Sequence, residues 1–316
     1  MIEVLKKIYK SGRIKQIFLN RLVLFTALFI LVQPKTKKSL ELLQLSIDQK
    51  VLRKLRKKSQ SKIVFFQQRF EDFIENFEDL SDVIWIFWLQ GIENAPELVK
   101  ICHEYLKENL PAGKRIILLD EDNYKNYTNL PEYIEEKHRE GKISHTHFSD
   151  IIRMDLLARH GGTWMDSTVL LSAVPTHNFM FESSLFLFQE MEPSKMGHSR
   201  RISSWFITSN PNNPIILLTR YLLFDYWKNH GSLIDYFLLH SYLELAIESY
   251  PEEWNKVVPF NNATPHILQF KLFKDYQDIE WTRIKEQVEI HKLTYKFKEE
   301  IKPNTYIDRI LNKSLD

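Results

Sequence analysis

The stretch Ser149–Leu171, SDIIRMDLLARHGGTWMDSTVLL, carries the most information about the fold of this chain. It predicts an amphipathic helix bearing Asp150 and Arg153, a break at a Gly-Gly pair, and a short strand that ends near Asp166. The chain has only 8 glycines in 316 residues, so two adjacent ones indicate a turn that needs residues without a Cβ atom. A lone carboxylate at the end of an apolar strand is costly to bury unless cations or hydrogen-bond donors surround it. The arrangement suits a divalent metal that holds a diphosphate.

Two further strand signals precede this stretch. Val83–Trp88, VIWIFW, and Arg115–Asp120, RIILLD, are short apolar runs with the composition of buried strands. A helix is expected between them, from Asn94 to about Asn109. The alternation of strand and helix predicts a parallel or mixed sheet with helices on both faces, and ligands bind such sheets beyond the carboxyl ends of the strands. Trp88, Asp120 and Asp166 should therefore meet at one edge of the sheet.

The N-terminal segment is strongly basic. Residues 1–62 hold 16 Lys and Arg against 3 Asp and Glu, a net charge of +13 in a chain whose total is +2. Its apolar run Leu22–Val32 covers only about half of a ~30 Å hydrocarbon core at ~1.5 Å per residue. Basic residues beside anionic head groups contribute about 1 kcal/mol each. The segment favours a monotopic or peripheral anchor, while a single membrane span and a buried helix of the fold remain open.

The composition also bears on compartment and partners. A single cysteine, Cys102, rules out an intramolecular disulfide and fits a reducing cytoplasm. The basic segment lacks the interleaved aromatic residues of a nucleic-acid stacking platform, so we expect no nucleic-acid partner. Together these features predict a peripheral or monotopic protein on the cytoplasmic face of a membrane.

Three regions are expected along the chain. Residues 1–62 form a basic, partly apolar helical segment, and within it residues 36–62 read as an amphipathic helix. Residues 63–298 form the catalytic domain, beginning with a second, acidic and aromatic helix over residues 63–80. Residues 299–316 form a polar C-terminal tail.

The motif S-D-x-x-R-x-x-x-L-x-x-x-G-G-x-[WY]-x-D-x-[DT], which ends here at Thr168, resembles that of the capsular polysaccharide synthesis protein family. This family lies within the glycosyltransferases with a DXD-containing sugar-binding region. The similarity runs from about residue 83 to about residue 296, through WIFWLQGIENAPELV, LPEYI, SSWFITS, DYFLLH and IHKLTYK. It implies an α/β fold of the GT-A type, a Rossmann-like mixed sheet flanked by helices, here with an N-terminal helical membrane-associating extension. Thr168 replaces the second Asp of the DXD motif, which leaves a strict metal requirement open.

The resemblance also assigns roles to individual residues. The implied catalytic residues are Asp166, Asp150, whose carboxylate would accept hydrogen bonds from the donor sugar, and Arg153, whose planar guanidinium would bind the sugar or the diphosphate. The implied donor-binding residues are Trp88, which would stack on uracil, and Gln90, Gly91, Gly161, Gly162 and Lys292. A Mn²⁺ or Mg²⁺ ion would be held by Asp166, His291 and Thr168. The acceptor-side candidates are Asp235, His240 and Trp205.

The implied function is transfer of a hexose from a nucleotide sugar, which we expect to be UDP-linked, to a lipid-linked oligosaccharide during capsule or exopolysaccharide synthesis. The expected acceptor carries an undecaprenyl diphosphate, and the family implies retention of the anomeric configuration. Two alternatives stay open, namely a non-catalytic assembly subunit that keeps the fold and a phosphoglycosyl-type transferase. The sequence does not identify the sugar, the linkage, the acceptor or the oligomeric state.

Overall fold

The centre of the molecule is a mixed sheet of five strands in the order β2-β1-β3-β6-β5. The computed structural model describes residues 17–34, 36–190 and 202–315. β1 pairs in parallel with β2 and β3, whereas β6 runs antiparallel to both β3 and β5. A separate two-stranded sheet joins β4 and β7. The strands are β1 (Val83–Phe87), β2 (Arg115–Leu119), β3 (Gly162–Met165), β4 (Val169–Leu171), β5 (Leu185–Gln189), β6 (Ile202–Ser209) and β7 (Ile290–Lys292).

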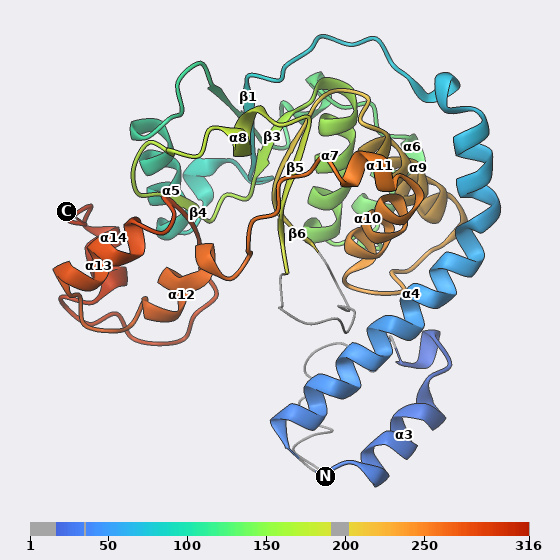
Figure 1. The fold of residues 1–316 in the computed structure, drawn as a ribbon, viewed down its shortest axis with the longest axis horizontal. Coiled ribbons are helices and arrows are strands. Elements are labelled where there is room, and N and C mark those ends of the chain that lie inside the picture. The colour runs from blue at the N-terminus through green and yellow to red at the C-terminus, as the bar shows by residue number, and fades with distance from the viewer. Residues whose placement is uncertain (1–16, 35, 191–201, 316) are drawn as a thin grey trace.

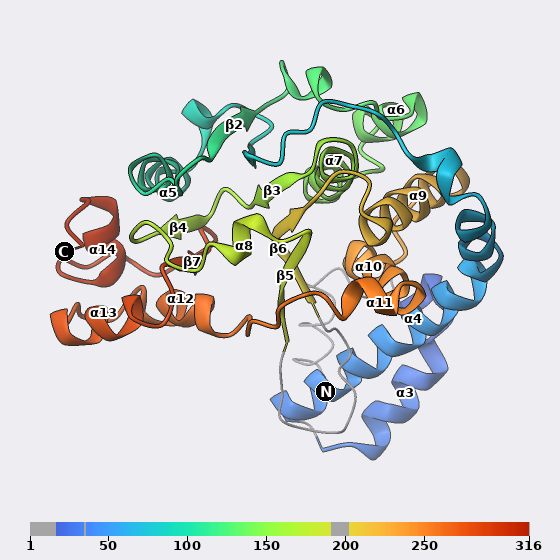
Figure 2. The same cartoon turned by 45° about the horizontal axis from the view of Figure 1, so that its top comes forward.

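Helices cover both faces of the central sheet, as the alternation of apolar segments predicts (Figures 1 and 2). The α7, α9 and α10 helices pack on one face and α4 lies outside them, whereas α8 lies against β5 and β6. The α5, α12 and α14 helices gather around the small sheet. The helices are α3 (Val23–Val32), α4 (Lys37–Gln68), α5 (Glu97–Glu108), α6 (Glu132–Arg139), α7 (His145–His160), α8 (Phe179–Glu182), α9 (Pro214–Asn229), α10 (Leu238–Ser249), α11 (Pro251–Trp254), α12 (Ile267–Lys271), α13 (Asp278–Lys285) and α14 (Tyr306–Leu311).

The strand β1 divides the core in two. Its side chains alternate, so Trp85 packs in the cluster on the α7 side, while Ile84 and Ile86 pack in the cluster on the α8 side. The parallel pairing aligns the carboxyl ends of β1, β2 and β3 at one edge. Both predicted strands before the motif are confirmed, and Trp88 and Asp166 directly follow β1 and β3.

The helix α7 differs from its prediction as an amphipathic helix. Nearly all of its side chains are buried, because α7 lies between the sheet and α9 rather than on the surface. Its fully buried carboxylate, Asp155, accepts hydrogen bonds from Arg159 at 3.1 Å and from Arg220 at 3.2 Å. The charges on α7 are therefore tolerated because each has a partner within the core.

The boundaries predicted for the terminal regions need correction. Residues 1–16 of the predicted N-terminal region lie outside the described residues. The helix α4 runs without a break from Lys37 to Gln68, so no second helix spans residues 63–80. Seven apolar residues of α4 are buried in the main core: Leu43, Ile47, Val51, Leu52, Leu55, Ile63 and Phe66. The predicted polar tail is also part of the fold, because Tyr306, Ile307 and Ile310 of α14 are buried against the α5 region. Among the described helices, none has the length and apolar content that crossing a membrane requires.

Candidate active site

A cavity of about 530 Å³ opens at the carboxyl ends of β1 and β3. Its other walls are formed by the first turns of α7, the end of β7 and the segment after it, together with Tyr236, His266 and Gln269. Six residues predicted for the site line this cavity: Trp88, Gln90, Arg153, Asp166, Thr168 and Lys292. The edge that the strand pattern predicted is therefore the edge that carries the cavity, although Asp120, which follows β2, does not line it.

Asp166 lies at the centre of this cavity, in the turn between β3 and β4. Its Oδ1 accepts hydrogen bonds from Arg153 Nη2 at 3.1 Å and from Trp164 Nε1 at 3.0 Å. Its Oδ2 lies 3.5 Å from Lys292 Nζ. Two cations and an indole N–H thus compensate the charge of the carboxylate, which explains how an apolar strand can end in Asp166.

Arg153 is held on α7 and reaches under Asp166. Its guanidinium lies over the Trp164 ring, 4.7 Å from the ring centroid, and only 4% of the residue is exposed. Nη1 lies 3.3 Å from Asp150 Oδ1, yet neither Nη1 nor Nε has a hydrogen-bond partner among the described residues. A buried guanidinium with such donors at a cavity wall is a site for an anionic ligand.

Lys292 comes from the other end of the chain. The β4–β7 ladder pairs Val169 with Lys292, and the Leu293 N–H donates to the Thr168 carbonyl at 2.9 Å. This register places the Lys292 ammonium against the Thr168 hydroxyl as well as near Asp166. The small sheet therefore joins a late lysine to the motif, as the resemblance implied for Lys292.

Asp150 lies one turn before Arg153 and is buried behind the cavity rather than in its lining. Burial alone would raise the pKa of its carboxyl group, but His147, Arg153 and His240 outweigh this effect and the pKa lies below its ordinary value. Asp150 is therefore ionised and positions Arg153. The structure does not place its carboxylate where a donor sugar would lie.

Two tryptophans of the WIFW segment have different surroundings. Trp88 lines the cavity, and its ring meets Tyr295 edge-on at 5.6 Å between centroids. Trp85 is fully buried, and its indole N–H donates to the Gly161 carbonyl at 2.8 Å. Trp88 can therefore contact a ligand, whereas Trp85 fixes the junction between α7 and β3.

The predicted donor-binding glycines have structural roles instead. A Cβ atom on Gly161 would lie 2.7 Å from the Ser209 carbonyl, and one on Gly162 would lie 2.6 Å from the Val83 carbonyl. Both residues have positive φ and stand at the start of β3, away from Asp166 at its end. Gly91, whose φ is +78°, closes the turn after Trp88 and does not line the cavity. The structure thus gives these three glycines roles in turns and close packing, and their donor-binding role stays a prediction.

The position of His291 does not fit its predicted role as a metal ligand. It is fully buried, and its Nε2 lies 3.0 Å from the Ser172 hydroxyl, while its ring packs on Trp281. Because side chains alternate along β7, His291 points away from the cavity that its neighbour Lys292 enters. Burial lowers the pKa of its imidazole to about 3.

The acceptor-side candidates do not line the cavity. Trp205 is buried, stacks on Phe188 with 4.5 Å between centroids and donates its N–H to Asn262. Asp235 is buried, and its carboxylate accepts a hydrogen bond from the Phe237 N–H at 3.3 Å. His240 lies behind the cavity wall near Asp150. Tyr236 of the same DYFLLH segment does line the cavity, and the acceptor-side roles of the three candidates stay predictions.

The residues that the sequence reasoning missed are aromatic and basic. Tyr236, Tyr295 and Lys296 all line the cavity. The last two belong to IHKLTYK, but β7 ends at Lys292 and the residues after it line the cavity without alternation. A strand pattern continued from Lys292 would have indicated Lys296 and not Tyr295. Arg153, Lys292 and Lys296 together give the cavity a positive character around a single carboxylate.

The donor set does not fit the divalent metal that the DXD resemblance implies. Both oxygens of Asp166 face cations, the Thr168 hydroxyl contacts Lys292, and His291 points elsewhere. In the described ranges, no three His, Cys, Asp or Glu side chains are grouped so that they could hold a metal ion. Near a protein surface two unit charges 4 Å apart repel by about 4 kcal/mol, and a divalent ion beside Lys292 would meet about twice that.

Comparisons with known proteins support the family resemblance but not the details of the site. The family model described as capsular polysaccharide synthesis protein matches residues 33–310. No curated protein matches the chain. Among solved structures, the chain is similar to one titled PaToxG Glycosyltransferase, with 16% identity and a TM-score of 0.39 over 63% of this chain and 80% of that chain. A structural similarity at this TM-score gives no information about the site.

Proposed function

Because this chain belongs to the capsular polysaccharide synthesis protein family, we propose that it is a glycosyltransferase that uses a nucleotide sugar. It transfers a hexose, from a UDP-linked donor, to a lipid-linked oligosaccharide. The observation that carries the proposal is the cavity in which Arg153 and Lys292 flank Asp166. A donor of this kind carries a diphosphate, and this pair of cations is suited to bind it.

The cations would act on the leaving group. During transfer the bond between the anomeric carbon and the β-phosphate oxygen breaks, and the electron pair stays on the phosphate. Arg153 and Lys292 stabilise this growing negative charge, and such fixed electrostatic stabilisation is usually the largest contribution to catalysis. A new bond forms between an acceptor hydroxyl oxygen and the anomeric carbon.

We propose transfer with retention, as the family resemblance implies. In a front-face reaction the departing phosphate oxygen takes the proton of the acceptor hydroxyl, so no separate base is needed. Asp166, which is 29% exposed at its side chain, is the carboxylate nearest to this chemistry and orients both cations. Tyr236 and Thr146, which also line the cavity, would contact the sugars.

The nucleobase would lie against Trp88. This indole and Tyr295 form an aromatic corner in the cavity, and the Trp88 N–H has no hydrogen-bond partner among the described residues. Base–aromatic stacking contributes about 1–3 kcal/mol per base. Because a stacking ring does not distinguish bases, the preference for uracil rests on the resemblance alone.

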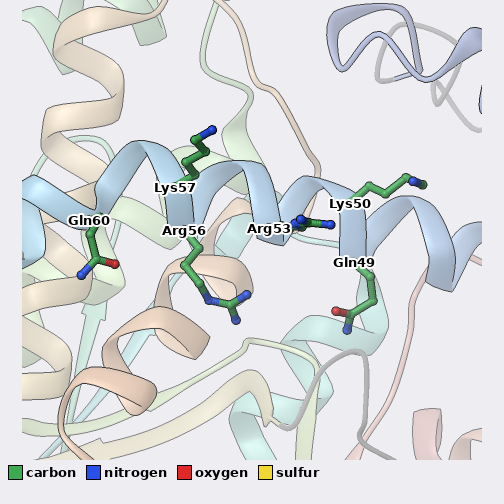
Figure 3. A pocket seen from close by; sticks show the side chains of 6 residues that line it. All are labelled: Gln49, Lys50, Arg53, Arg56, Lys57 and Gln60. Carbon is green, nitrogen blue, oxygen red and sulfur yellow. The ribbon is translucent and has the colours of Figure 1, made fainter.

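The acceptor would be held at a membrane surface, and α3 and α4 support this proposal. On α3, Leu24, Leu31 and Val32 are 72%, 79% and 79% exposed. On α4, a shallow hollow is lined by Gln49, Lys50, Arg53, Arg56, Lys57 and Gln60 (Figure 3). Exposed apolar residues beside a basic face are typical of proteins that bind anionic bilayers.

The position of this basic and apolar surface relative to the cavity supports the same proposal. β3 pairs antiparallel with β6, so its Met165 end points toward the start of β6. In Figure 1 this end of the sheet and the α3–α4 pair lie toward the same end of the molecule. A bilayer on the cytoplasmic face of the plasma membrane would then present an undecaprenyl-diphosphate acceptor on the cavity side.

Binding of nucleotides tests the proposal directly. The full chain should bind UDP more tightly than UMP, because the second phosphate meets Arg153 and Lys292. Calorimetric titration with UDP, GDP, ADP and UMP measures this preference. Equal affinity for UDP and UMP would contradict the role given to the cations, and no binding of any nucleotide would favour a non-catalytic assembly subunit.

A further inference from the structure

We propose that Arg153 and Lys292 take the place of a divalent metal at this site, so that a nucleotide diphosphate binds without one. The proposal rests on the proposed function and concerns how the same site holds its donor. It departs from the DXD resemblance, in which two carboxylates and a metal hold the diphosphate. The observations that carry it are the contacts of Asp166, Thr168 and Lys292.

The carboxylate is already engaged by protein cations. Asp166 Oδ1 receives the Arg153 guanidinium at 3.1 Å, and Asp166 Oδ2 faces the Lys292 ammonium at 3.5 Å. A metal ligand must present an oxygen toward the ion, but both oxygens here face positive groups. Arg153 and Lys292 thus place two positive groups at the carboxylate that would otherwise hold the ion.

The fold holds Lys292 in its position beside Asp166. Its strand is paired with β4, and its ammonium contacts the Thr168 hydroxyl and the Leu293 carbonyl, the latter at 3.2 Å. Only 17% of its side chain is exposed. Thr168 stands at the position of the second carboxylate of a DXD motif. A carboxylate there would bind the ammonium strongly, whereas the neutral hydroxyl leaves its charge available to a ligand.

Arg153 supplies the second half of the anion site. It is more than nine-tenths buried at the cavity wall, and its Nε has no hydrogen-bond partner among the described residues, while Nη1 has only an ion pair with Asp150 Oδ1 at 3.3 Å. Phosphate oxygens would satisfy these donors. The Trp164 ring beneath the guanidinium keeps its plane fixed.

Calorimetric titration of the full chain with UDP tests the inference, once with EDTA and once with Mn²⁺. We expect affinities that differ by less than about threefold, since no ion takes part in binding. In EDTA, Lys292→Met should weaken UDP binding at least about tenfold, because a hydrogen bond to a charged group is lost. Lys292→Arg should retain most of the affinity. The control Lys298→Met removes an exposed lysine that does not line the cavity and should change nothing.

The outcomes separate this inference from the proposed function. UDP binding that requires Mn²⁺ and disappears in EDTA would overturn the inference but leave the glycosyltransferase proposal intact. Unchanged affinity of a folded Lys292→Met protein in EDTA would also overturn it. Failure to bind any nucleotide diphosphate under either condition would overturn the proposed function, and the inference with it. Thermal unfolding of each variant shows whether it is folded.

Discussion

At the residue scale, the contrast between Trp88 and Trp85 shows how a shift of three positions separates binding from packing. Trp88 follows the strand and borders the cavity, whereas Trp85 lies within the strand and is fully buried. The alternation of side chains along β1 predicts this difference, because residues three apart point to opposite faces of the sheet. The two residues therefore form a matched pair for experiment.

Trp88→Ala should weaken UDP binding by about 1–3 kcal/mol, which is the contribution of base–aromatic stacking. Its free energy of unfolding should change little, because the ring is only partly buried. Titration calorimetry measures the first quantity and urea unfolding the second. Unchanged UDP affinity in the folded variant would contradict stacking of the nucleobase on Trp88.

Trp85→Ala should instead lower the free energy of unfolding by about 3–5 kcal/mol, as expected for truncation of a large buried ring. The variant also loses the hydrogen bond to the Gly161 carbonyl. Where enough folded protein is obtained, its UDP affinity should stay close to that of the wild type. Weakened UDP binding with normal stability would show that the two faces have been assigned in reverse.

At the scale of elements, the junction between α7 and β3 depends on the Gly161-Gly162 pair. Gly162→Ala should destabilise the protein by about 1–3 kcal/mol, because positive φ is strained for residues with a Cβ atom. A Cβ atom there would also meet two backbone carbonyls, at 2.6 and 2.8 Å. The control Gly231→Ala has open space around its Cβ position and no positive φ. Equal stability of the two variants in urea unfolding would contradict this role of the glycine pair.

The strand β7 makes a second prediction, about pH. Burial lowers the pKa of His291 to about 3 in the folded state, against 6.5 ordinarily. The unfolded chain therefore binds the extra proton between these values, and stability present above pH 6.5 is lost as the pH falls toward 3. Lowering the pH from 7 to 5 should cost about 2 kcal/mol from this residue.

The measurement for His291 is the free energy of unfolding at pH 7 and at pH 5. His291→Gln, which does not titrate, should reduce the loss between these pH values by about 2 kcal/mol. A variant that loses as much stability as the wild type over this range would show that His291 is not the buried neutral imidazole described here.

At the scale of the whole molecule, an ion-paired arginine and two other basic residues share one face of α4. Arg56 Nη2 lies 2.6 Å from Glu248 Oε1, whereas Arg53 and Lys57 form no ion pair within the described ranges. Partial burial, and to a smaller extent the charges of Lys58 and Arg21, lower the pKa of nearby Lys54. The face is therefore suited to anionic head groups.

Replacing Arg53 and Lys57 by Glu should reduce binding to anionic vesicles at least tenfold, by about 1 kcal/mol or more for each charge removed. Arg56→Ala, which removes a cation already paired with Glu248, should have a much smaller effect. Leu24→Glu with Leu31→Glu should abolish the binding that survives high salt, because that part is apolar. Co-sedimentation measures each variant, and equal binding by all of them would contradict a membrane-facing surface.

Much of this architecture could be predicted from the sequence, but its tertiary details could not. The apolar runs located β1 and β2, and the motif located Asp166 and Arg153. The role of His291 was wrong because a one-residue step along β7 turns a side chain to the other face. The Gly-Gly turn was predicted correctly, but the close packing of these glycines against the Val83 and Ser209 carbonyls is not visible in a motif.

In the terminal regions, too, composition did not predict which residues pack in the core. Composition marked residues 299–316 as a polar tail, although three apolar residues of α14 are enough to anchor it to the core. The basic helix was expected to be an appendage, but one face of α4 packs on α9 and α10. Charge describes the exposed face of such an element and says little about the buried one.

The central claim is that the cavity around Asp166 transfers sugar from a nucleotide donor. The most direct test incubates membranes containing the full chain with radiolabelled UDP-sugars and measures label in the lipid extract. Wild type should transfer label from at least one donor, and Asp166→Asn, which keeps the volume but removes the charge, should be at least about 100-fold slower. Transfer by folded Asp166→Asn above a tenth of the wild-type rate would contradict the claim.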